Sequence, residues 1–391
     1  MQTSADVMIS IKYKSFRRVS VLSRVCLHQG MTTSSIDEAK LNEFMTKVWN
    51  ELAGAWSASL VIIGDKLGLY RAMADSRPIT SQELASKTNT TERYIREWLA
   101  NQAAGGYISY DVATGKYTLP AEHALALANE NSPAFVMGGF QITSVLIKDE
   151  SKIVEAFRTG KGVDWGDHDP MLYEATERSF KPNYVANIVS SWIPALDGGK
   201  VAEKLKEGGA RVADVGCGHG ISTIIMAKAY PDSKFIGFDN HAPSIEYASK
   251  KAKEEGLAED RIRFDVASAT GFTKENEYDL VTSFDCLHDM GDPGGAALRV
   301  FQTLKKPDGV WMIVEPFAND KMEDNLNPLG RAFYAASTVL CVPASLAHNG
   351  PALGAQAGEA RIAEIVKGGS GFKHFKRATQ TPFNIIYEAK T

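Results

Sequence analysis

Short apolar runs alternate with amphipathic stretches through the second half of the chain. The runs have the length of buried strands and lie at residues 211–215, 234–239, 261–266, 278–284 and 309–316. The clearest stretches with helical spacing between them are residues 221–229, 243–255 and 295–305. Strands that alternate with helices form a parallel sheet with helices on its faces. The pattern therefore predicts an α/β fold for this half.

The first third of the chain has helical periodicity instead. Apolar residues recur at helical spacing from Phe44 onward, with Trp49 and Trp56 on a neighbouring face. Thr80 and Glu83 have the spacing of a capping box, which marks the start of a helix. The elements that follow are helices at 79–85 and 92–99 and two short strands at 107–110 and 116–119. This order predicts a winged helix-turn-helix.

A length of 391 residues suggests more than one domain. We expect a winged-helix domain at 31–130, a helical connector at 131–200, and an α/β domain at 201–391 with an insertion at about 318–365. Residues 1–30 are rich in Lys, Arg and Ser. We interpret them as a disordered or untranslated leader before Met31, with a transit peptide, whose composition they resemble, as the alternative.

Charge and cysteine usage narrow the classes of partner. The net charge of −4 gives no general attraction to nucleic acid or to an anionic membrane. No apolar run approaches the length of about 18 residues that a spanning helix needs. The four cysteines contain no C-x-x-C pair, so we expect no zinc site, no disulfide framework and a cytoplasmic location.

The expected recognition helix of the winged-helix domain carries balanced charge. Glu92 and Glu97 offset Arg93 and Arg96. Binding to DNA depends on Lys and Arg side chains that neutralise phosphates. The sequence therefore argues against nucleic acid as a partner, although a DNA-binding regulator with a ligand-sensing α/β domain stays open as the alternative.

A glycine-rich turn follows the first predicted strand of the α/β domain. Asp214, Gly216, Gly218 and Gly220 form the pattern Asp-x-Gly-x-Gly-x-Gly, directly before a helix. A dinucleotide fingerprint would need its third glycine where Ile221 stands. Glycine permits close approach of a ligand to the backbone, and an acid here can meet an ammonium group. Cys217 is interpreted as a small filler in this loop.

This segment resembles the class I S-adenosylmethionine-dependent methyltransferases. The resemblance covers roughly residues 200–391 and implies a Rossmann-like sheet of seven strands, mostly parallel with an antiparallel last strand. The runs at 372–378 and 383–389 resemble its closing edge. It implies S-adenosyl-L-methionine as cofactor, with the ribose hydroxyls held by Asp239 after the second strand.

The resemblance also assigns the remaining cofactor contacts. Family members usually end the third strand with an acid–alanine pair near the adenine, but here Ser268 fills the slot of that acid and Asp265 belongs to the strand itself. Adenine recognition therefore departs from the family pattern. The expected cofactor-binding residues are Asp214, Gly216, Cys217, Gly218, Gly220, Asp239, Asn240, Asp265, Ser268, Phe284 and Asp285.

Methyl transfer from a sulfonium is an in-line displacement, in which positioning supplies much of the rate. An acceptor that must lose a proton also needs a general base. His288, just after the fourth strand, matches the catalytic-base histidine of plant-type O-methyltransferases, and Asp289 or Asp285 would orient its ring. His168 is the rival base and Glu315 a more distant one. We expect no metal ion.

The predicted acceptor is a small molecule, methylated at oxygen or nitrogen. Trp165 and His168 lie in a Gly- and Asp-rich loop of the connector, and Phe317 and Tyr334 lie in or before the insertion. These four residues are the expected substrate contacts and suggest an aromatic or apolar acceptor. The winged-helix module resembles the N-terminal domain of small-molecule O-methyltransferases, which implies a homodimer. A chain that binds the cofactor for other chemistry, or for none, is a third interpretation.

Overall fold

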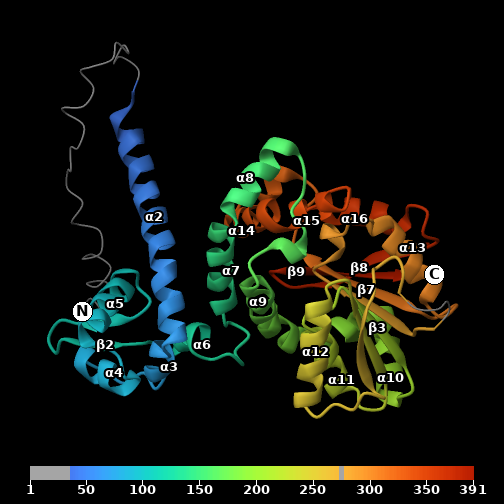
Figure 1. Cartoon of the computed structure of the whole chain (residues 1–391), viewed down its shortest axis with the longest axis horizontal. Coiled ribbons are helices and arrows are strands. Elements are labelled where there is room, and N and C mark those ends of the chain that lie inside the picture. Colours follow the sequence, from blue (N-terminus) through green and yellow to red (C-terminus); the bar gives the residue numbers. More distant parts are fainter. Residues whose placement is uncertain (1–35, 273–276) are drawn as a thin grey trace, which may run out of the picture. The chain divides into compact units, whose positions relative to one another are not determined.

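The computed structural model describes residues 36–272 and 277–391 (Figure 1). The chain divides into two units, residues 1–55 and 56–391. The long helix α2 (Glu38–Lys66) crosses this boundary. The predicted leader at 1–30 lies outside the described residues.

A winged helix-turn-helix domain opens the second unit, as predicted. After α2 it contains α3 (Leu69–Ala72), α4 (Ser81–Thr88), α5 (Glu92–Ala104), β1 (Ser109–Asp111), β2 (Lys116–Thr118) and α6 (Ala121–Leu127). The expected capping box begins α4, because Thr80 Oγ1 accepts from the Glu83 amide at 3.2 Å and the Glu83 carboxylate accepts from the Thr80 amide at 2.7 Å. The indole of Trp98 donates to the Leu60 carbonyl at 2.9 Å and ties α5 to α2.

A series of helices connects this domain to the sheet. They are α7 (Met137–Lys148), α8 (Glu150–Thr159), η1 (Trp165–Asp167), α9 (Met171–Asn187), the π-helical η2 (Ile188–Trp192), η3 (Ile193–Gly199) and α10 (Lys200–Glu207). Helices α7 and α9 cross closely at Gly138, where a Cβ atom would lie 2.3 Å from the Ser179 amide nitrogen. Only glycine permits this crossing without displacing one of the two helices.

The sheet domain has seven strands in the order β5-β4-β3-β6-β7-β9-β8. The strands are β3 (Arg211–Val215), β4 (Lys234–Asp239), β5 (Ile262–Val266), β6 (Leu280–Phe284), β7 (Val310–Pro316), β8 (His374–Gln380) and β9 (Asn384–Lys390). Strands β3 to β7 pair in parallel, and β9 is antiparallel to both of its neighbours. The predicted methyltransferase-like sheet with an antiparallel last strand is confirmed.

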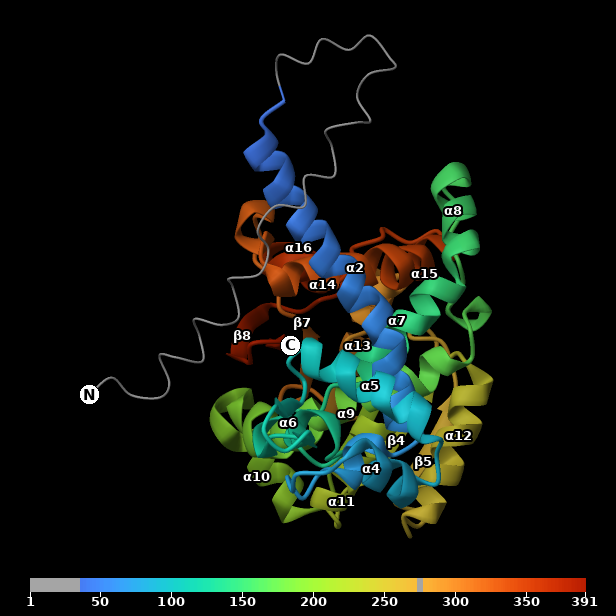
Figure 2. The ribbon, with the colours of Figure 1, turned by 90° about the vertical axis from the view of Figure 1, so that its left-hand side faces the viewer.

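Two apolar layers cover the sheet, because successive residues of each strand face opposite sides. One layer packs the sheet against α10, α11 (Ile221–Ala229) and α12 (Ala242–Glu254), and the other against α13 (Pro293–Thr303) and α16 (Gly358–Lys367). Figure 2 shows α10 and α11 on one side of the sheet and α15 and α16 on the other. The strand order reverses between β3 and β6, where ligands bind in open α/β sheets.

The predicted insertion after β7 is helical. It contains η5 (Met322–Asn325), α14 (Pro328–Ala336), the π-helical η6 (Ser337–Cys341), α15 (Val342–Ala347) and the start of α16. Within residues 36–272 and 277–391, one continuous helix, Pro328–Ala347, has the length and the apolar composition of a membrane-spanning helix, with a mean hydropathy of 1.2. The sequence-based statement that no such run exists is therefore wrong. Cys341, in this helix, contacts His288, as described below, so the helix packs against the sheet domain.

Candidate active site

The glycine-rich turn has a backbone that only glycine adopts without strain. Gly216, Gly218 and Gly220 have φ angles of 76°, 50° and 75°. A Cβ atom on Gly216 would lie 2.6 Å from Cys286 Sγ, and one on Gly220 would lie 2.6 Å from the Phe264 ring. A Cβ on Gly218 would meet nothing within 4 Å. The turn is therefore packed tightly against the sheet at its two ends and open at its centre.

Asp214 is completely buried below this turn. Its carboxylate accepts hydrogen bonds from the hydroxyls of Ser222 and Thr223, both at 2.6 Å, and of Thr282 at 2.9 Å. Burial raises the pKa of Asp214 and these hydroxyls oppose the shift. The carboxylate thus anchors the first turn of α11 to β6, and its predicted approach to the cofactor's ammonium group stays a prediction.

Asp239, at the carboxyl end of β4, faces a cavity. Its Oδ2 accepts from the Gly218 amide at 2.9 Å and its Oδ1 from the His241 amide at 2.9 Å. Burial raises the pKa of this carboxyl group, and the two amides oppose the shift. Asp239 therefore couples the glycine turn to the end of the neighbouring strand.

The cavity has a volume of about 340 Å³ and lies along the carboxyl edge of the sheet. Five predicted site residues line it, namely Trp165, Gly216, Asp239, Asn240 and Ser268. Asp289, which was predicted as a possible orienting group for His288, also lines it. The remaining lining residues had no predicted role and are Asp164, Ala267, Ala269, Thr270, Cys286, Met290, Gly291, Asp292, Ala344 and His348. Ala267 to Thr270 directly follow β5, so the loop rather than the strand forms this part of the wall.

Several other predicted contacts do not line this cavity. The Asp265 carboxylate pairs with Arg263 at 3.2 Å, and the Phe284 ring is buried in the sheet core. Phe317 packs against the opposite layer of the core, and Tyr334 is exposed on α14. Asp214, Cys217, Gly218, Gly220, Asp285, His168 and His288 are likewise absent from its lining.

Asp285 follows β6 with a φ of 51°, a left-handed conformation that turns the chain sharply. Both carboxylate oxygens are occupied, because the Tyr184 hydroxyl donates to Oδ2 at 2.8 Å and the Asn384 amide to Oδ1 at 2.7 Å. Burial, with the nearby Glu315, raises the pKa of Asp285 to about 7. Asp285 therefore fixes the strand end and is not the residue that orients His288.

Glu315 orients His288. His288 is buried, and its Nδ1 lies 2.6 Å from Glu315 Oε2, while the Leu287 amide donates to Glu315 Oε1 at 3.1 Å. The expectation that Asp285 or Asp289 would hold this ring is wrong. Strands β6 and β7 pair with Phe284 opposite Val314, so Glu315, the next residue of β7, lies beside the chain that leaves β6 towards His288.

The other nitrogen of His288 meets a thiol. Its Nε2 lies 3.3 Å from Cys341 Sγ, at the end of η6. Burial disfavours the imidazolium, but Glu315 and Cys341 outweigh this effect and raise the pKa of His288 well above its ordinary value. An imidazole with a fixed carboxylate on one nitrogen can accept or hold a proton on the other.

His168 forms a second buried histidine–carboxylate pair. Its Nδ1 lies 2.8 Å from Asp149 Oδ2, and Lys152 contacts the same carboxylate group at 2.8 Å. Across the described ranges, no hydrogen-bond partner reaches its Nε2. The Trp165 ring packs at 6.3 Å from the His168 ring, and the cavity-lining Asp164 pairs with His348 at 2.6 Å. The predicted connector loop therefore contributes to the cavity through Asp164 and Trp165.

Cys341 packs against a small apolar cluster. Its buried members are Val145 of α7, Leu172 of α9 and Leu340 of η6, and the partly buried residues that pack on them are Ile142, Leu146, Trp165, Met171, Val339 and Cys341. The connector helices and the insertion therefore meet beside His288 and form an apolar wall there.

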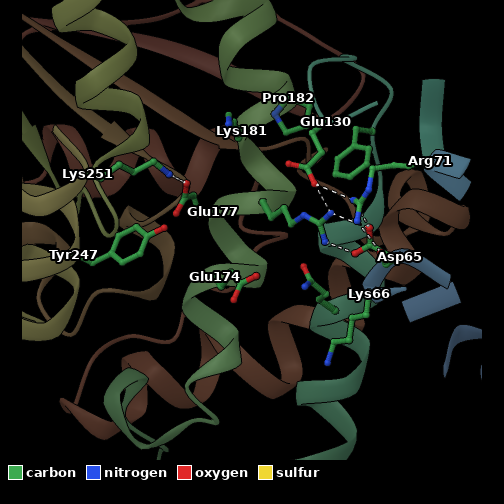
Figure 3. Close-up of a pocket in the computed structure, with 13 residues that line it drawn as sticks. Asp65, Lys66, Arg71, Glu130, Glu174, Glu177, Lys181, Pro182, Tyr247 and Lys251 are labelled. Carbon is green, nitrogen blue, oxygen red and sulfur yellow. Dashed lines mark hydrogen bonds and ion pairs between the residues drawn. The ribbon is translucent and has the colours of Figure 1, made fainter. Parts of the chain in front are cut away.

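A second hollow, of about 400 Å³, is lined by charged side chains near α9 (Figure 3). Figure 3 shows Lys251 reaching Glu177, with which it forms an ion pair. The other oxygen of Glu177 lies 3.0 Å from Nδ1 of His219, in the glycine turn. The His219 ring stacks on Tyr247 with centroids 4.0 Å apart. Helix α9 thus supports the glycine turn from outside the first cavity.

Two family models match the sequence of this chain. One describes an Rv2258c-like winged HTH domain and covers residues 55–129, and the other describes a methyltransferase domain and covers residues 206–350. The chain joins a winged helix-turn-helix domain to a methyltransferase domain. The glycine turn lies in this methyltransferase domain. So does most of the lining of the cavity at the sheet edge.

Curated relatives match only part of the chain. The ubiquinone biosynthesis O-methyltransferase of Actinobacillus pleuropneumoniae serotype 5b is 36% identical over 109 residues, which are 26% of this chain and 44% of the relative. The trans-aconitate 2-methyltransferase of Methylobacterium radiotolerans is 30% identical over 123 residues, or 32% and 43% of the two chains. The chain therefore spans less than half the length of these relatives.

Solved structures match nearly the whole chain, at low identity. A putative O-methyltransferase from Nostoc punctiforme has a TM-score of 0.64 at 19% identity and covers 92% of this chain and 100% of its own. The mitomycin 7-O-methyltransferase MmcR has a TM-score of 0.63 at 18% identity, with 91% and 100% covered. Human N-acetylserotonin methyltransferase, solved with its cofactor, has a TM-score of 0.60 at 17% identity, with 92% and 99% covered. These likenesses show that the methyltransferase domain and the winged-helix domain together form a known fold.

Proposed function

We propose that the protein transfers the methyl group of S-adenosyl-L-methionine to a small apolar or aromatic acceptor, most simply at oxygen. One observation carries this proposal: the cavity that holds Gly216 and Asp239 lies at the same sheet edge as the buried His288–Glu315 pair. Cys286, Asp289 and Met290, the neighbours of His288 in sequence, line that cavity.

The residues present suit the cofactor. The backbone at Gly216 and Gly218 is free of Cβ atoms, and Asp239 supplies a carboxylate that can accept from both ribose hydroxyls. Ser268 and its neighbours after β5 would border the adenine, with backbone amides in place of the usual acid. When bound, the cofactor supplies an activated methyl group on a sulfonium.

The remaining chemistry belongs to the protein's own side chains. When its ring is neutral, His288 can take the proton of an acceptor hydroxyl at Nε2, the nitrogen that Cys341 contacts, and Glu315 stabilises the resulting imidazolium from the opposite side. The apolar cluster beside Cys341 excludes water and favours an acceptor with an aromatic or aliphatic surface. Transfer to a nitrogen acceptor would use the same base.

The regulator alternative finds less support. On α5, Arg93 pairs with Glu97 at 2.6 Å and Arg96 with Glu92 at 2.7 Å. Arginines that are paired within their own helix leave little charge for DNA phosphates. We propose that the N-terminal helices form a homodimer through α2 rather than bind DNA.

The cofactor proposal is tested by titrating S-adenosylmethionine and S-adenosylhomocysteine calorimetrically. We expect Asp239→Asn to weaken binding about 10- to 100-fold, because hydrogen bonds to charged groups contribute about 1.5–3 kcal/mol. Asp265→Asn is the matched control, since that carboxylate pairs with Arg263 outside the cavity, and its affinity should equal that of the wild type. Equal affinities for all three proteins, or no binding by any of them, would contradict the proposal.

A further inference from the structure

Cys341 is the last residue of a π-helical turn, η6, and its thiol lies directly against His288. Wide π-turns are rare and are often found at functional sites. The turn places Sγ 3.3 Å from Nε2 of His288, while the residue itself is partly exposed. A thiol at this distance can exchange a proton with the imidazole.

Three side chains stand in series at this point. Cys341 contacts Nε2 of His288, and Glu315 contacts Nδ1 at 2.6 Å. The Leu287 amide fixes the second oxygen of Glu315 at 3.1 Å. A nucleophile, a base and a group that orients the base, each within hydrogen-bond reach of the next, is the arrangement that activates thiols and hydroxyls in covalent catalysis.

The other cysteines that the structure describes have different surroundings. Cys286 Sγ lies 3.3 Å from the Val215 carbonyl, and Cys217 is buried with its Sγ 3.8 Å from the Gly218 carbonyl. A carbonyl oxygen cannot take a proton from a thiol. Cys217 and Cys286 therefore serve as internal references for the reactivity of the Cys341 thiol.

We propose that Cys341 is a nucleophilic thiol activated by His288, and that it is a site of covalent modification by small soft carbon electrophiles such as alkyl halides. From the neutral form of the ring, the thiol proton passes to Nε2 of His288, a bond forms between Sγ and the electrophilic carbon, and the carbon–halogen bond breaks as halide leaves. The product is a thioether beside a protonated imidazole, whose charge Glu315 balances. The apolar cluster of Ile142, Trp165, Met171 and Val339 favours electrophiles with an apolar body.

Modification at Cys341 would also shut the methyl-transfer site. A thioether would occupy the space next to Nε2, which the acceptor must reach to lose its proton. This consequence rests on the proposed function, whereas the reactivity of the thiol does not. Cofactor binding measured in parallel separates the two proposals. Labelling of the thiol without cofactor binding would remove the proposed function and leave the nucleophilic thiol in place. Cofactor binding without labelling of the thiol would remove the nucleophilic thiol and leave the proposed function in place.

The test is alkylation of the folded full-length protein by iodoacetamide, followed residue by residue by peptide mass spectrometry. We expect His288→Gln, which keeps a polar side chain without a base, to slow alkylation of Cys341 at least tenfold. Glu315→Gln should slow it to a smaller extent. Cys217 and Cys286 should react at unchanged rates in each variant, which controls for general opening of the fold.

Two results would overturn the proposal. One is an equal rate of Cys341 alkylation in the wild type and in both variants. The other is a Cys341 that stays unlabelled in the folded wild type and is labelled only in urea. If His288→Gln fails to fold, as judged by circular dichroism, the Glu315→Gln comparison decides the matter by itself.

Discussion

At the scale of single residues, His288 has a different partner on each nitrogen, a carboxylate on Nδ1 and a thiol on Nε2. The carboxylate stabilises the imidazolium in a buried setting, so the ring holds a proton at higher pH than an exposed histidine does. As a general base, His288 would then become competent only as pH rises through this elevated pKa. Its charge is therefore controlled mainly by Glu315.

We predict that Glu315→Gln lowers the pKa of His288, because the substitution removes the adjacent negative charge that stabilises the imidazolium. The measurement is an NMR titration of protein with ¹³C-labelled histidine, with His288→Gln to assign the resonance. Because the folded pKa is raised, the pair stabilises the fold fully below about pH 6.5 and loses this contribution as pH rises through the folded value. Glu315→Gln should remove that pH dependence.

Glu177→Gln is the matched control for this titration. Glu177 also contacts a histidine, His219, but on the outer side of the glycine turn. Its replacement should leave the His288 titration unchanged. A His288 midpoint that does not move in Glu315→Gln would show that the carboxylate does not set its charge.

At the scale of elements, the glycine turn illustrates how one motif combines two constraints. Gly216 and Gly218 both have positive φ, but only Gly216 lacks room for a Cβ atom, because Cys286 Sγ is 2.6 Å from that position. The turn therefore depends on the strand end after β6 as much as on its own sequence.

We predict that Gly216→Ala destabilises the protein by about 2–4 kcal/mol, which combines the cost of a left-handed alanine with that of overpacking. Gly218→Ala should cost only about 1–2 kcal/mol, because the backbone cost remains and the space is open. Urea unfolding measures both values. Equal losses in the two variants would mean that the contact with Cys286 does not constrain the turn.

The succession of strands and helices around the sheet, and the winged helix-turn-helix, could be predicted from the sequence because these elements have local patterns of their own. The strands at 211–215, 234–239 and 309–316, the capping box at Thr80 and the closing hairpin all follow from short-range spacing. The predicted helix from 295 starts two residues earlier, at Pro293, because Asp292 caps it by accepting from the Gly295 amide. Local signals of this kind need no knowledge of neighbouring elements.

The partners in the site depend on register and on packing, which leave no local signal. Glu315 rather than Asp285 holds His288 because β6 and β7 pair with Phe284 opposite Val314. One sequence signal could have pointed to this partner: Glu315 is a polar residue near the end of β7, the strand next to β6, and His288 follows β6. The approach of His348 to Asp164, and of Cys341 to His288, joins segments far apart in sequence and could not be predicted in the same way.

At the scale of the whole molecule, helix α2 carries large apolar side chains that are exposed in the chain taken alone. Met45, Trp49, Leu52, Trp56 and Ile63 recur at helical spacing, and Trp49 and Trp56 are 58% and 67% exposed. Contiguous exposed apolar residues of this kind mark protein interaction surfaces. This feature supports the proposed homodimer.

We predict that Trp49→Glu combined with Trp56→Glu converts a dimer into a monomer, as measured by analytical ultracentrifugation. The reason is that each charge would be buried without a partner in the dimer interface. Tyr94→Glu is the control, because Tyr94 is a single exposed aromatic residue on α5 and should leave the mass unchanged. A wild-type protein that sediments as a monomer at micromolar concentration would contradict the dimer.

The position of β9 has a consequence for biosynthesis. This strand lies between β7 and β8, and both of them precede it in the sequence. Until residues 384–390 have been made, the edge of β7 has no hydrogen-bonding neighbour on that side, and β8 has nothing to pair with. Open strand edges invite pairing with other chains. A nascent chain therefore keeps one edge of β7 and the whole of β8 open to such pairing until β9 has been made.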